Sequence, residues 1–160
     1  MDKLWAPWRV TYIKKIGKAQ KGCVFCRMRQ EKKDKENYVV IRTRYCYAVL
    51  NIYPYNNGHM LIVPNRHVND LTKLKKEERD DLYTLLEETK SLLDRALKPG
   101  GYNIGINLGR VAGAGFPGHL HFHIVPRWHG DVNFMPVTAS TKIISQSLKT
   151  LYETLVFQLR

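Results

Sequence analysis

The chain has 160 residues, 44% of them hydrophobic and 25% charged, and a mass of 18.6 kDa. This is the composition of a globular domain, and no segment approaches the roughly 20 consecutive apolar residues of a membrane-spanning helix. Lys and Arg outnumber Asp and Glu by 26 to 14, a net charge of +12. Such a charge suits an anionic ligand, and it suits solubility and weak nonspecific binding of nucleic acid equally well.

The N-terminal segment, MDKLWAPWRVTYIKK, is basic but lacks the apolar core and small-residue cleavage site of a signal peptide. We therefore expect a cytoplasmic protein whose three cysteines form no disulfide framework. Cys23 and Cys26 form CVFC, a spacing that supplies half of a zinc site or serves redox chemistry. Redox pairs usually open a helix after a strand of a βαβ unit, and the antiparallel strands expected here favour metal instead. Cys46 lies in an apolar run and is expected to be a buried small hydrophobe.

The polar segment from Arg29 to Asn37 is predicted to be a solvated loop. Short β-type runs follow it, with YPYNNG as the turn between the last two; the runs are Tyr38 to Thr43, Cys46 to Ile52 and His59 to Pro64. We expect these runs to pair as neighbouring antiparallel strands.

Leucines at helical spacing predict a helix from Lys75 to Lys98, which the PGG sequence at 99–101 ends. A strand is expected from Tyr102 to Gly109, then a glycine-rich loop, RVAGAGFPG, and another strand that ends near Pro126. A C-terminal amphipathic helix is predicted from the spacing of Ile144, Leu148, Leu151, Leu155 and Leu159. The pattern predicts one α+β domain over residues 1–160, with an N-terminal segment 1–36, a core 37–135 and a C-terminal helix 136–160.

Three histidines, His119, His121 and His123, alternate within GHLHFHIVPRW. Because side chains alternate across a strand, we expect the imidazoles to share one face while the apolar residues between them are buried on the other. Like positions on one strand face lie about 6.6–6.8 Å apart, which lets the rings surround one bound group such as a phosphate. The alternative is a chance alternation on an exposed strand, which would leave the imidazole charge and lone pairs unused.

The loop before the histidines contains Gly109, Gly113, Gly115 and Gly118. Glycines permit close backbone approach and inward-turned amides, as anion-binding nests require. Alone, the loop would be explained equally well as a plain turn. Beside the histidines, it predicts a cradle for phosphate oxygens.

The run from His119 to Val125, three histidines separated by single apolar residues, resembles the signature of the histidine triad family of nucleotide hydrolases and transferases. The resemblance continues through LNIYPYNNGHMLIVPNRH, GINLG and PRWHGDVNF, and with LWAPWR it looks most like bacterial members related to diadenosine tetraphosphate phosphorylases. It implies an α+β fold with a long central helix, and usually a homodimer. Many members have Ser, Thr or Gln shortly before the triad, where this chain has Gly115 to Gly118, so backbone amides would contact the phosphate here.

The resemblance implies catalytic roles for three histidines. His121 corresponds to the nucleophile that attacks the α-phosphorus and carries the nucleotide as a phosphoramidate. A neutral imidazole can do this if an acceptor, commonly a backbone carbonyl, keeps its other nitrogen protonated. His123 and His59 correspond to positions near the phosphate, where a donor stabilises charge on its oxygens. For His59, a surface histidine at a turn is the alternative.

The resemblance also implies nucleotide contacts. Asn51 and Asn107 match positions that contact the sugar and phosphate side, Ile52 would cover the base, and Gly113 and Gly115 belong to the phosphate loop. An asparagine that ends a strand is often only a turn cap, which is the alternative for both asparagines.

In similar family members, the remaining zinc ligands are the histidine after the IVP strand and the first histidine of the triad, which are His67 and His119 here. With Cys23 and Cys26 they would form a closed structural Cys2His2 site that ties the N-terminal segment to the active-site strand. Such a site leaves His121 for chemistry, and no organic cofactor is implied.

The sequence therefore predicts a nucleotidyl hydrolase or transferase that cleaves a dinucleoside polyphosphate or a related nucleotide through covalent nucleotidylation of His121, with phosphate or water as acceptor. A zinc-stabilised nucleic-acid-binding module, suggested by the +12 charge and by Trp5, Trp8 and Trp128, is the alternative, but it does not explain the alternating histidines. Removal of adenylate from DNA ends is a third hypothesis, for which no obvious DNA-binding finger is appended. We expect a nucleotide substrate, a homodimer, no membrane association, and nucleic acid only as a weak nonspecific partner.

Overall fold

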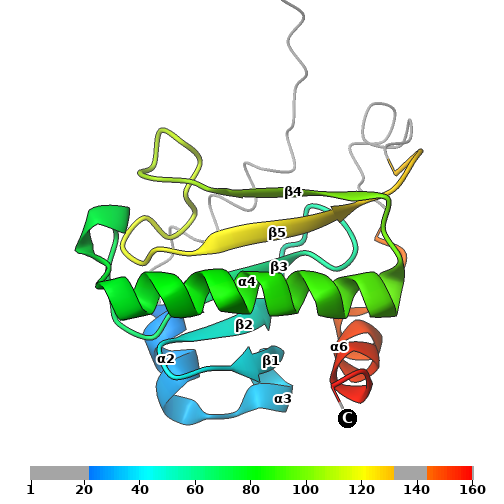
Figure 1. The fold of residues 1–160 in the computed structure, drawn as a ribbon, viewed down its shortest axis with the longest axis horizontal. Coiled ribbons are helices and arrows are strands. Elements are labelled where there is room, and N and C mark those ends of the chain that lie inside the picture. The colour runs from blue at the N-terminus through cyan, green and yellow to red at the C-terminus, as the bar shows by residue number, and fades with distance from the viewer. Residues whose placement is uncertain (1–21, 132–143, 160) are drawn as a thin grey trace, which may run out of the picture.

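A computed structural model describes residues 22–131 and 144–159, so LWAPWR and the segment 132–143 lie outside the described residues. Five antiparallel strands form one sheet in the order β1-β2-β3-β5-β4 (Figure 1). The strands are β1 Val39–Arg42, β2 Cys46–Leu50, β3 Met60–Pro64, β4 Gly101–Ile106 and β5 Phe122–Arg127. The α+β class and the antiparallel pairing of the first three strands are as the sequence predicted.

Helices cover the sheet. The long helix α4 runs along one side of it, with α6 beside the end of α4 (Figure 1). The helices are α2 Val24–Glu31, α3 Asp34–Asn37, a 3₁₀ turn Leu71–Lys73, α4 Lys76–Leu97 and α6 Leu148–Phe157. In the described part of the chain, none of these helices has both the length and the apolar character needed to cross a membrane.

The central strands are buried on both faces, and the alternation of their side chains builds two apolar cores. The larger core lies against α4 and α6, and the smaller one includes Phe25 of α2. Strands β2 and β3 give the larger core Cys46, Ala48, Leu50, Met60 and Ile62, and the smaller core Tyr47, Val49, Leu61 and Val63. The buried position of Cys46 agrees with its expected role as a small hydrophobe.

The polar segment Arg29 to Asn37 is not the loop that the sequence predicted, because α2 extends into it and α3 follows. Left-handed residues end each helix, Lys32 at φ 51° and Tyr38 at φ 56°. Arg42 of β1 donates to both carboxylate oxygens of Asp34 and to a carbonyl of α2. Bonds to a strand outside the segment therefore hold a segment whose composition alone indicates a loop.

The other element boundaries shift by smaller amounts. Helix α4 matches the prediction, and Lys98 ends it in a left-handed conformation at φ 46°. The predicted C-terminal helix is shorter than expected: α6 begins at Leu148, after Ile144, and ends before Leu159. Ser147 caps it by accepting a hydrogen bond from the amide of Thr150, which fixes where it starts.

Candidate active site and metal centre

The three alternating histidines lie at the start of β5, on the same side of the sheet as α2. Strand β5 begins only at Phe122, so His119 and His121 belong to the segment before the strand, which differs from the prediction of one continuous strand. His123 pairs with Leu61 of β3 and Gly105 of β4. The intervening Leu120, Phe122 and Ile124 pack in or against the core under α4.

His121 is buried, and its ring is held in one tautomer. Its Nδ1 lies 2.8 Å from the carbonyl oxygen of His119, an acceptor, so Nδ1 carries the proton and Nε2 keeps its lone pair. Burial lowers the pKa of His121, and the bond to this carbonyl opposes the shift only in part. Phe25 of α2 packs on the imidazole with 5.1 Å between ring centroids. The result is a neutral, oriented imidazole with a basic nitrogen.

A chain of hydrogen bonds fixes the tautomer of His59. Asn51 Oδ1 accepts from the amide of Tyr53 at 2.9 Å, which identifies the other atom of this side chain as the NH₂ donor. That NH₂ group and the amide of Tyr55 both approach His59 Nδ1, at 3.3 and 2.9 Å. Because Nδ1 faces two donors, it is the acceptor, and the proton of neutral His59 sits on Nε2.

The same chain fixes His123. His59 Nε2 lies 2.9 Å from His123 Nδ1, and since His59 donates, the proton of His123 sits on its own Nε2. His123 Nε2 is buried and has no hydrogen-bond partner among the described residues. Burial, with a smaller contribution from His121, lowers the pKa of His123 to about 4. A buried donor without a partner is costly unless a ligand accepts from it.

The basic nitrogen and the donor therefore belong to adjacent rings. The centroids of His121 and His123 are 5.0 Å apart, closer than the spacing expected along one regular strand. A Cβ built on Gly105, across from His123, meets nothing within 4 Å. This open space beside His123 leaves room for a ligand.

Two aromatic residues near the histidines were missed in the sequence. The ring of Tyr55 stacks on His123, with centroids 5.7 Å apart and planes at 15°. Phe25 contacts His119 and His121. The sequence signals were their positions, one within the CVFC motif and one four residues before His59, but neither spacing alone indicates a contact.

Of the expected nucleotide-contacting residues, Asn51 contacts one of the histidines. Asn51 is both a turn cap and a partner of His59, so the two alternatives for it are compatible. Ile52 is exposed beside it, and Asn107 directly follows β4. In the glycine loop, the amide of Gly113 donates to the carbonyl of Arg110, so it is used within a turn, and Gly115 follows the buried Ala114.

His59 itself is 1% exposed, so it is not the surface histidine that was the alternative to a catalytic role.

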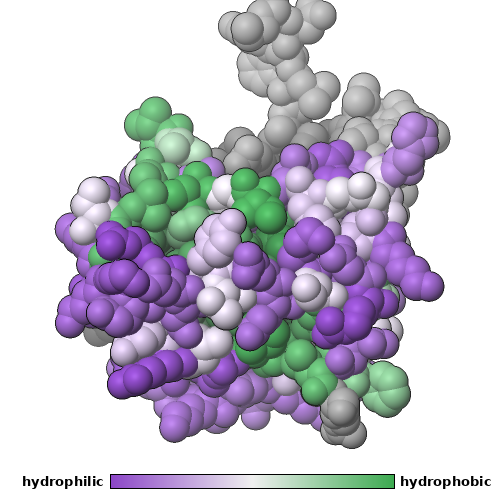
Figure 2. Space-filling view, viewed as in Figure 1, coloured by the Kyte–Doolittle hydropathy of each residue, from purple (hydrophilic) through white to green (hydrophobic). Residues whose placement is uncertain are grey.

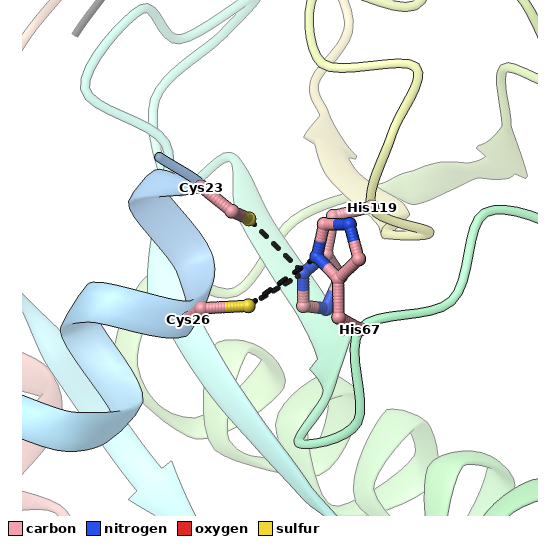
Figure 3. Close-up of side chains that lie close together, drawn as sticks. All are labelled: Cys23, Cys26, His67 and His119. Atoms are coloured by element: carbon pink, nitrogen blue, oxygen red, sulfur yellow. Dashed lines mark hydrogen bonds between the residues drawn. The ribbon is translucent and has the colours of Figure 1, made fainter. Parts of the chain in front are cut away.

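Four candidate metal ligands converge at the N-terminal end of α2 (Figure 3). Cys23 is the N-cap of this helix and Cys26 lies in its first turn, so the CxxC pair does open a helix. His67 comes from the loop after β3 and His119 from the segment before β5. One ligand atom from each residue lies within 4.8 Å of the others.

The donor set fits a zinc ion. His119 Nε2 donates to the carbonyl of Pro64 at 2.9 Å, so its Nδ1 has the lone pair. That Nδ1 lies 3.2 Å from Cys23 Sγ and 3.6 Å from Cys26 Sγ, and His67 Nδ1 lies 3.3 Å from Cys26 Sγ. Ideal tetrahedral Zn–S and Zn–N bonds imply sulfur–nitrogen separations of about 3.6 Å. The cluster is therefore close to the size of a tetrahedral Cys2His2 site.

Comparison with known proteins gives consistent results. Residues 32–130 match the HIT domain family. An AP-4-A phosphorylase of Mycobacterium tuberculosis H37Rv is 36% identical over 156 residues, which cover 93% of this chain and 80% of the relative.

Solved structures agree with the fold. A hypothetical histidine triad nucleotide-binding protein from Sulfolobus tokodaii superposes with a TM-score of 0.68 and 28% identity, covering 86% of this chain and 89% of that one. A Zn-bound histidine triad family protein from Mycobacterium smegmatis has a TM-score of 0.69 and 24% identity, covering 86% and 93%, an identity at which the likeness concerns the fold. From the alternating histidines, the sheet that carries them and these matches, we conclude that the chain belongs to the HIT domain family.

Proposed function

We propose that this chain is an enzyme that cleaves dinucleoside polyphosphates at the α-phosphate through a nucleotidyl intermediate on His121. The observation that carries the proposal is the 2.8 Å hydrogen bond between His121 Nδ1 and the carbonyl of His119. It leaves a lone pair on Nε2 of a neutral imidazole, which is what a nucleophile at phosphorus requires.

The first step forms a bond from His121 Nε2 to the α-phosphorus and breaks the bond to the bridging oxygen. The bonding electrons leave with the departing nucleoside polyphosphate. In the second step an oxygen of the acceptor attacks the same phosphorus, the phosphorus–nitrogen bond breaks, and its electrons return to Nε2. An ionised phosphate oxygen carries no proton to lose, whereas a water molecule releases one proton to the solvent. The imidazole is thereby restored to its starting state.

His123 and His59 support this chemistry as hydrogen-bond donors. The Nε2–H of His123 is buried and unpartnered among the described residues, and a phosphate oxygen or the bridging oxygen satisfies it. His59 donates to the other nitrogen of His123 at 2.9 Å, which keeps the proton on the side of the ligand. A fixed donor of this kind stabilises charge that develops on oxygen without having to reorient.

We assign the nucleotide contacts to Asn51, Ile52 and Asn107 and to the loop that contains Gly113 and Gly115. Ile52 is 48% exposed beside Asn51, which leaves an apolar surface for a base. Since the amide of Gly113 is used in its turn, phosphate contacts from this loop fall to amides beyond it, or require the turn to open.

We further propose that phosphate, rather than water, is the preferred acceptor. The support is the relative named AP-4-A phosphorylase, whose similarity extends over 93% of this chain and so includes all the described site residues. With phosphate as acceptor, the second product is a nucleoside diphosphate. With water, it is a monophosphate.

Zinc is proposed as a structural ion held by Cys23, Cys26, His67 and His119. A closed tetrahedral site with four protein ligands has no open position for substrate, so the ion would stabilise the fold around the nucleophile. The residues that bind, orient and transfer the nucleotide are then protein side chains alone.

A homodimer is also proposed. Figure 2 shows apolar surface over β4 and the loop that follows it, and the exposed apolar side chains of this region are Ile104, Leu108 and Val111. Among residues 22–131 and 144–159, strand β4 is an edge of the sheet, and no other described strand pairs with its outer side. An edge strand with exposed apolar side chains is suited to pairing with a second copy.

The decisive experiment is to trap the intermediate. Enzyme that turns over diadenosine tetraphosphate labelled at the α-phosphate, quenched in denaturant, is expected to carry acid-labile label on His121. In His121→Gly the label disappears and turnover falls by several powers of ten, as it does when other covalent enzymes lose their nucleophile, while nucleotide binding persists. His129→Gly, a change at an exposed histidine beyond β5, is the matched control and retains both.

Two outcomes would contradict these assignments. Turnover by His121→Gly close to that of wild type would exclude the covalent mechanism. Products that do not shift from monophosphate to diphosphate at saturating phosphate would exclude phosphate as the acceptor and make the enzyme a hydrolase.

A further inference from the structure

Asp131, just beyond β5, is joined to the turn between β2 and β3. Asn56 of this turn donates from Nδ2 to Asp131 Oδ2 at 2.7 Å and to the carbonyl of Pro126 at 3.1 Å. The Asp131 side chain is only 8% exposed. The turn is therefore attached to the end of β5 by a short hydrogen bond to a buried carboxylate.

The residue before Asn56 supplies the shorter of the two contacts that set the tautomer of His59. The amide of Tyr55 donates to His59 Nδ1 at 2.9 Å, and the carbonyl of Asn56 accepts from the amide of His59 at 3.2 Å. The amide that donates to His59 therefore belongs to the residue directly before the one whose side chain bonds the carboxylate. Displacing the Asn56 side chain moves the donor that holds the proton of His59 on Nε2.

We propose that Asp131 is a positioning residue: through Asn56 and the Tyr55 amide it holds His59 and His123 in the tautomers that present the His123 Nε2–H to the substrate. This inference rests on the proposed function and adds to it a residue that touches neither the substrate nor the reacting histidines.

The surroundings of Asp131 suit a carboxylate and no other side chain. Oδ2 accepts from Asn56, from Arg127 Nε at 2.6 Å and from the amide of Trp128 at 3.1 Å, while Oδ1 accepts from Arg127 Nη2 at 2.8 Å. All four contacts are donors. The hydrogen bonds from Arg127 lower the pKa of Asp131 to about 2, so the carboxylate stays ionised at neutral pH.

Loss of the carboxylate has a definite chemical consequence. If the Tyr55 amide withdraws, only the longer contact from Asn51, at 3.3 Å, still opposes a proton on Nδ1. A fraction of His59 then places its proton on Nδ1, and in that fraction Nε2 becomes an acceptor. His123 must then donate from Nδ1, so its own Nε2 loses the hydrogen and turns a lone pair toward the phosphate. A donor is replaced by an acceptor at the position where negative charge develops.

The first test reads the tautomers directly. In protein labelled with ¹⁵N-histidine, ring nitrogen shifts are expected to show the Nε2–H form for both His59 and His123 in wild type. Asp131→Ala and Asn56→Ala are expected to give mixtures of the two tautomers at His59. Asp34→Ala is the matched control, because Asp34 also accepts hydrogen bonds from Nε and Nη2 of an arginine, Arg42, but belongs to α3 and has no bond to the histidines among those of the described residues.

The second test is kinetic. Asp131→Ala and Asn56→Ala are each expected to lower kcat for diadenosine tetraphosphate by about tenfold or more with little change in KM, because alignment of the donor is lost while nucleotide contacts remain. Since the two residues act in series, the double variant should be no slower than either single one. Asp131→Asn, which keeps one acceptor oxygen for Asn56, should recover part of the loss.

The outcomes separate this inference from the proposed function. His59 and His123 tautomers that are the same in Asp131→Ala as in Asp34→Ala would overturn it, as would kcat losses that multiply in the double variant. If the wild type turned over no nucleotide, the proposed function would fail, and the tautomer measurement would still decide whether Asp131 positions the histidines.

Discussion

Three neighbouring imidazoles are kept uncharged by their burial. Desolvation lowers the pKa of His119 and of His123, each to about 4, and also lowers the pKa of His121. The neutral state suits the roles proposed for His121 and His123, because a protonated His121 has no lone pair with which to attack phosphorus. The same burial makes the folded protein sensitive to acid.

The sign of that sensitivity follows from the two states of His123. Its pKa is about 4 in the folded chain against an ordinary 6.5, so as pH falls below 6.5 the unfolded chain binds a proton that the folded chain does not. The contribution of neutral His123 to the free energy of unfolding is present above pH 6.5 and is lost as pH falls toward 4. Between pH 7 and pH 5 the loss from this group amounts to about 2 kcal/mol.

Replacing the group tests this value. In His123→Asn, the free energy of unfolding in urea is expected to fall between pH 7 and pH 5 by about 2 kcal/mol less than in wild type. His129→Asn, at the exposed histidine, should retain the wild-type dependence. Equal pH dependence in wild type and His123→Asn would show that His123 is not held neutral by burial.

At the scale of elements, the turn between β2 and β3 depends on one glycine. Gly58 has φ +73°, and a Cβ built on it lies 2.6 Å from Leu97 Cδ1 and 3.0 Å from Pro126 Cγ. The backbone therefore passes tightly between the end of α4 and β5. This contact holds the turn in place next to His59.

Gly58→Ala is expected to destabilise the fold by about 2–4 kcal/mol, since it adds left-handed backbone strain to an overpacked contact. Gly105→Ala is the control, because its Cβ meets nothing within 4 Å and its backbone is an ordinary strand. Its effect should be within about 1 kcal/mol. Comparable losses for both variants in thermal or urea unfolding would contradict the role given to the turn.

Helix α2 is joined to the sheet through the metal ligands and Phe25. We expect native mass spectrometry to find about one zinc ion per chain, and Cys23→Ser to lose it with a clear fall in the melting temperature. Cys46→Ala removes a buried thiol outside the ligand cluster and should retain the zinc. Wild-type protein purified without chelator but free of metal, or unchanged zinc in Cys23→Ser, would refute the assignment.

The elements that the sequence predicted well are those whose pattern is local. The leucine spacing of α4 and the alternation in β2 and β3 are each contained within one segment. The helices at 24–37 were missed because α2 is held by distant groups, Phe25 in the smaller core and the two cysteines beside His67 and His119. The composition of a segment does not predict its contacts with distant residues.

The site divides in the same way. The family resemblance indicated the candidate histidines. Their tautomers depend on distances that the sequence does not contain: 2.9 and 3.3 Å within the turn before His59, and 2.9 Å between His59 and His123, which lie 64 residues apart. Asp131 could not be predicted at all, since its partner Asn56 lies 75 residues earlier.

At the scale of the whole molecule, the edge that β4 forms among the described strands predicts the state of assembly. Light scattering at micromolar concentration is expected to give twice the chain mass of 18.6 kDa. Ile104 is 46% exposed on β4, and Ile104→Lys should shift the protein toward the monomer by placing a charge on the edge. Ile52→Lys, equally exposed but beside Asn51, is the control and should remain dimeric. A monomer mass for wild type would rule the dimer out.

The two-sided burial of the sheet also limits how this enzyme can change over evolutionary time. In β5, Ile124 lies under α4 while His123 faces the opposite way, against Leu61 and Gly105. A single inserted or deleted residue between Leu120 and the end of the strand would exchange these faces. It would place an imidazole in the apolar core and an aliphatic side chain at the proposed phosphate site. Point substitutions can change this site without moving the strand. Insertions and deletions in the segment cannot, because they would displace the core side chains on the other face of β5.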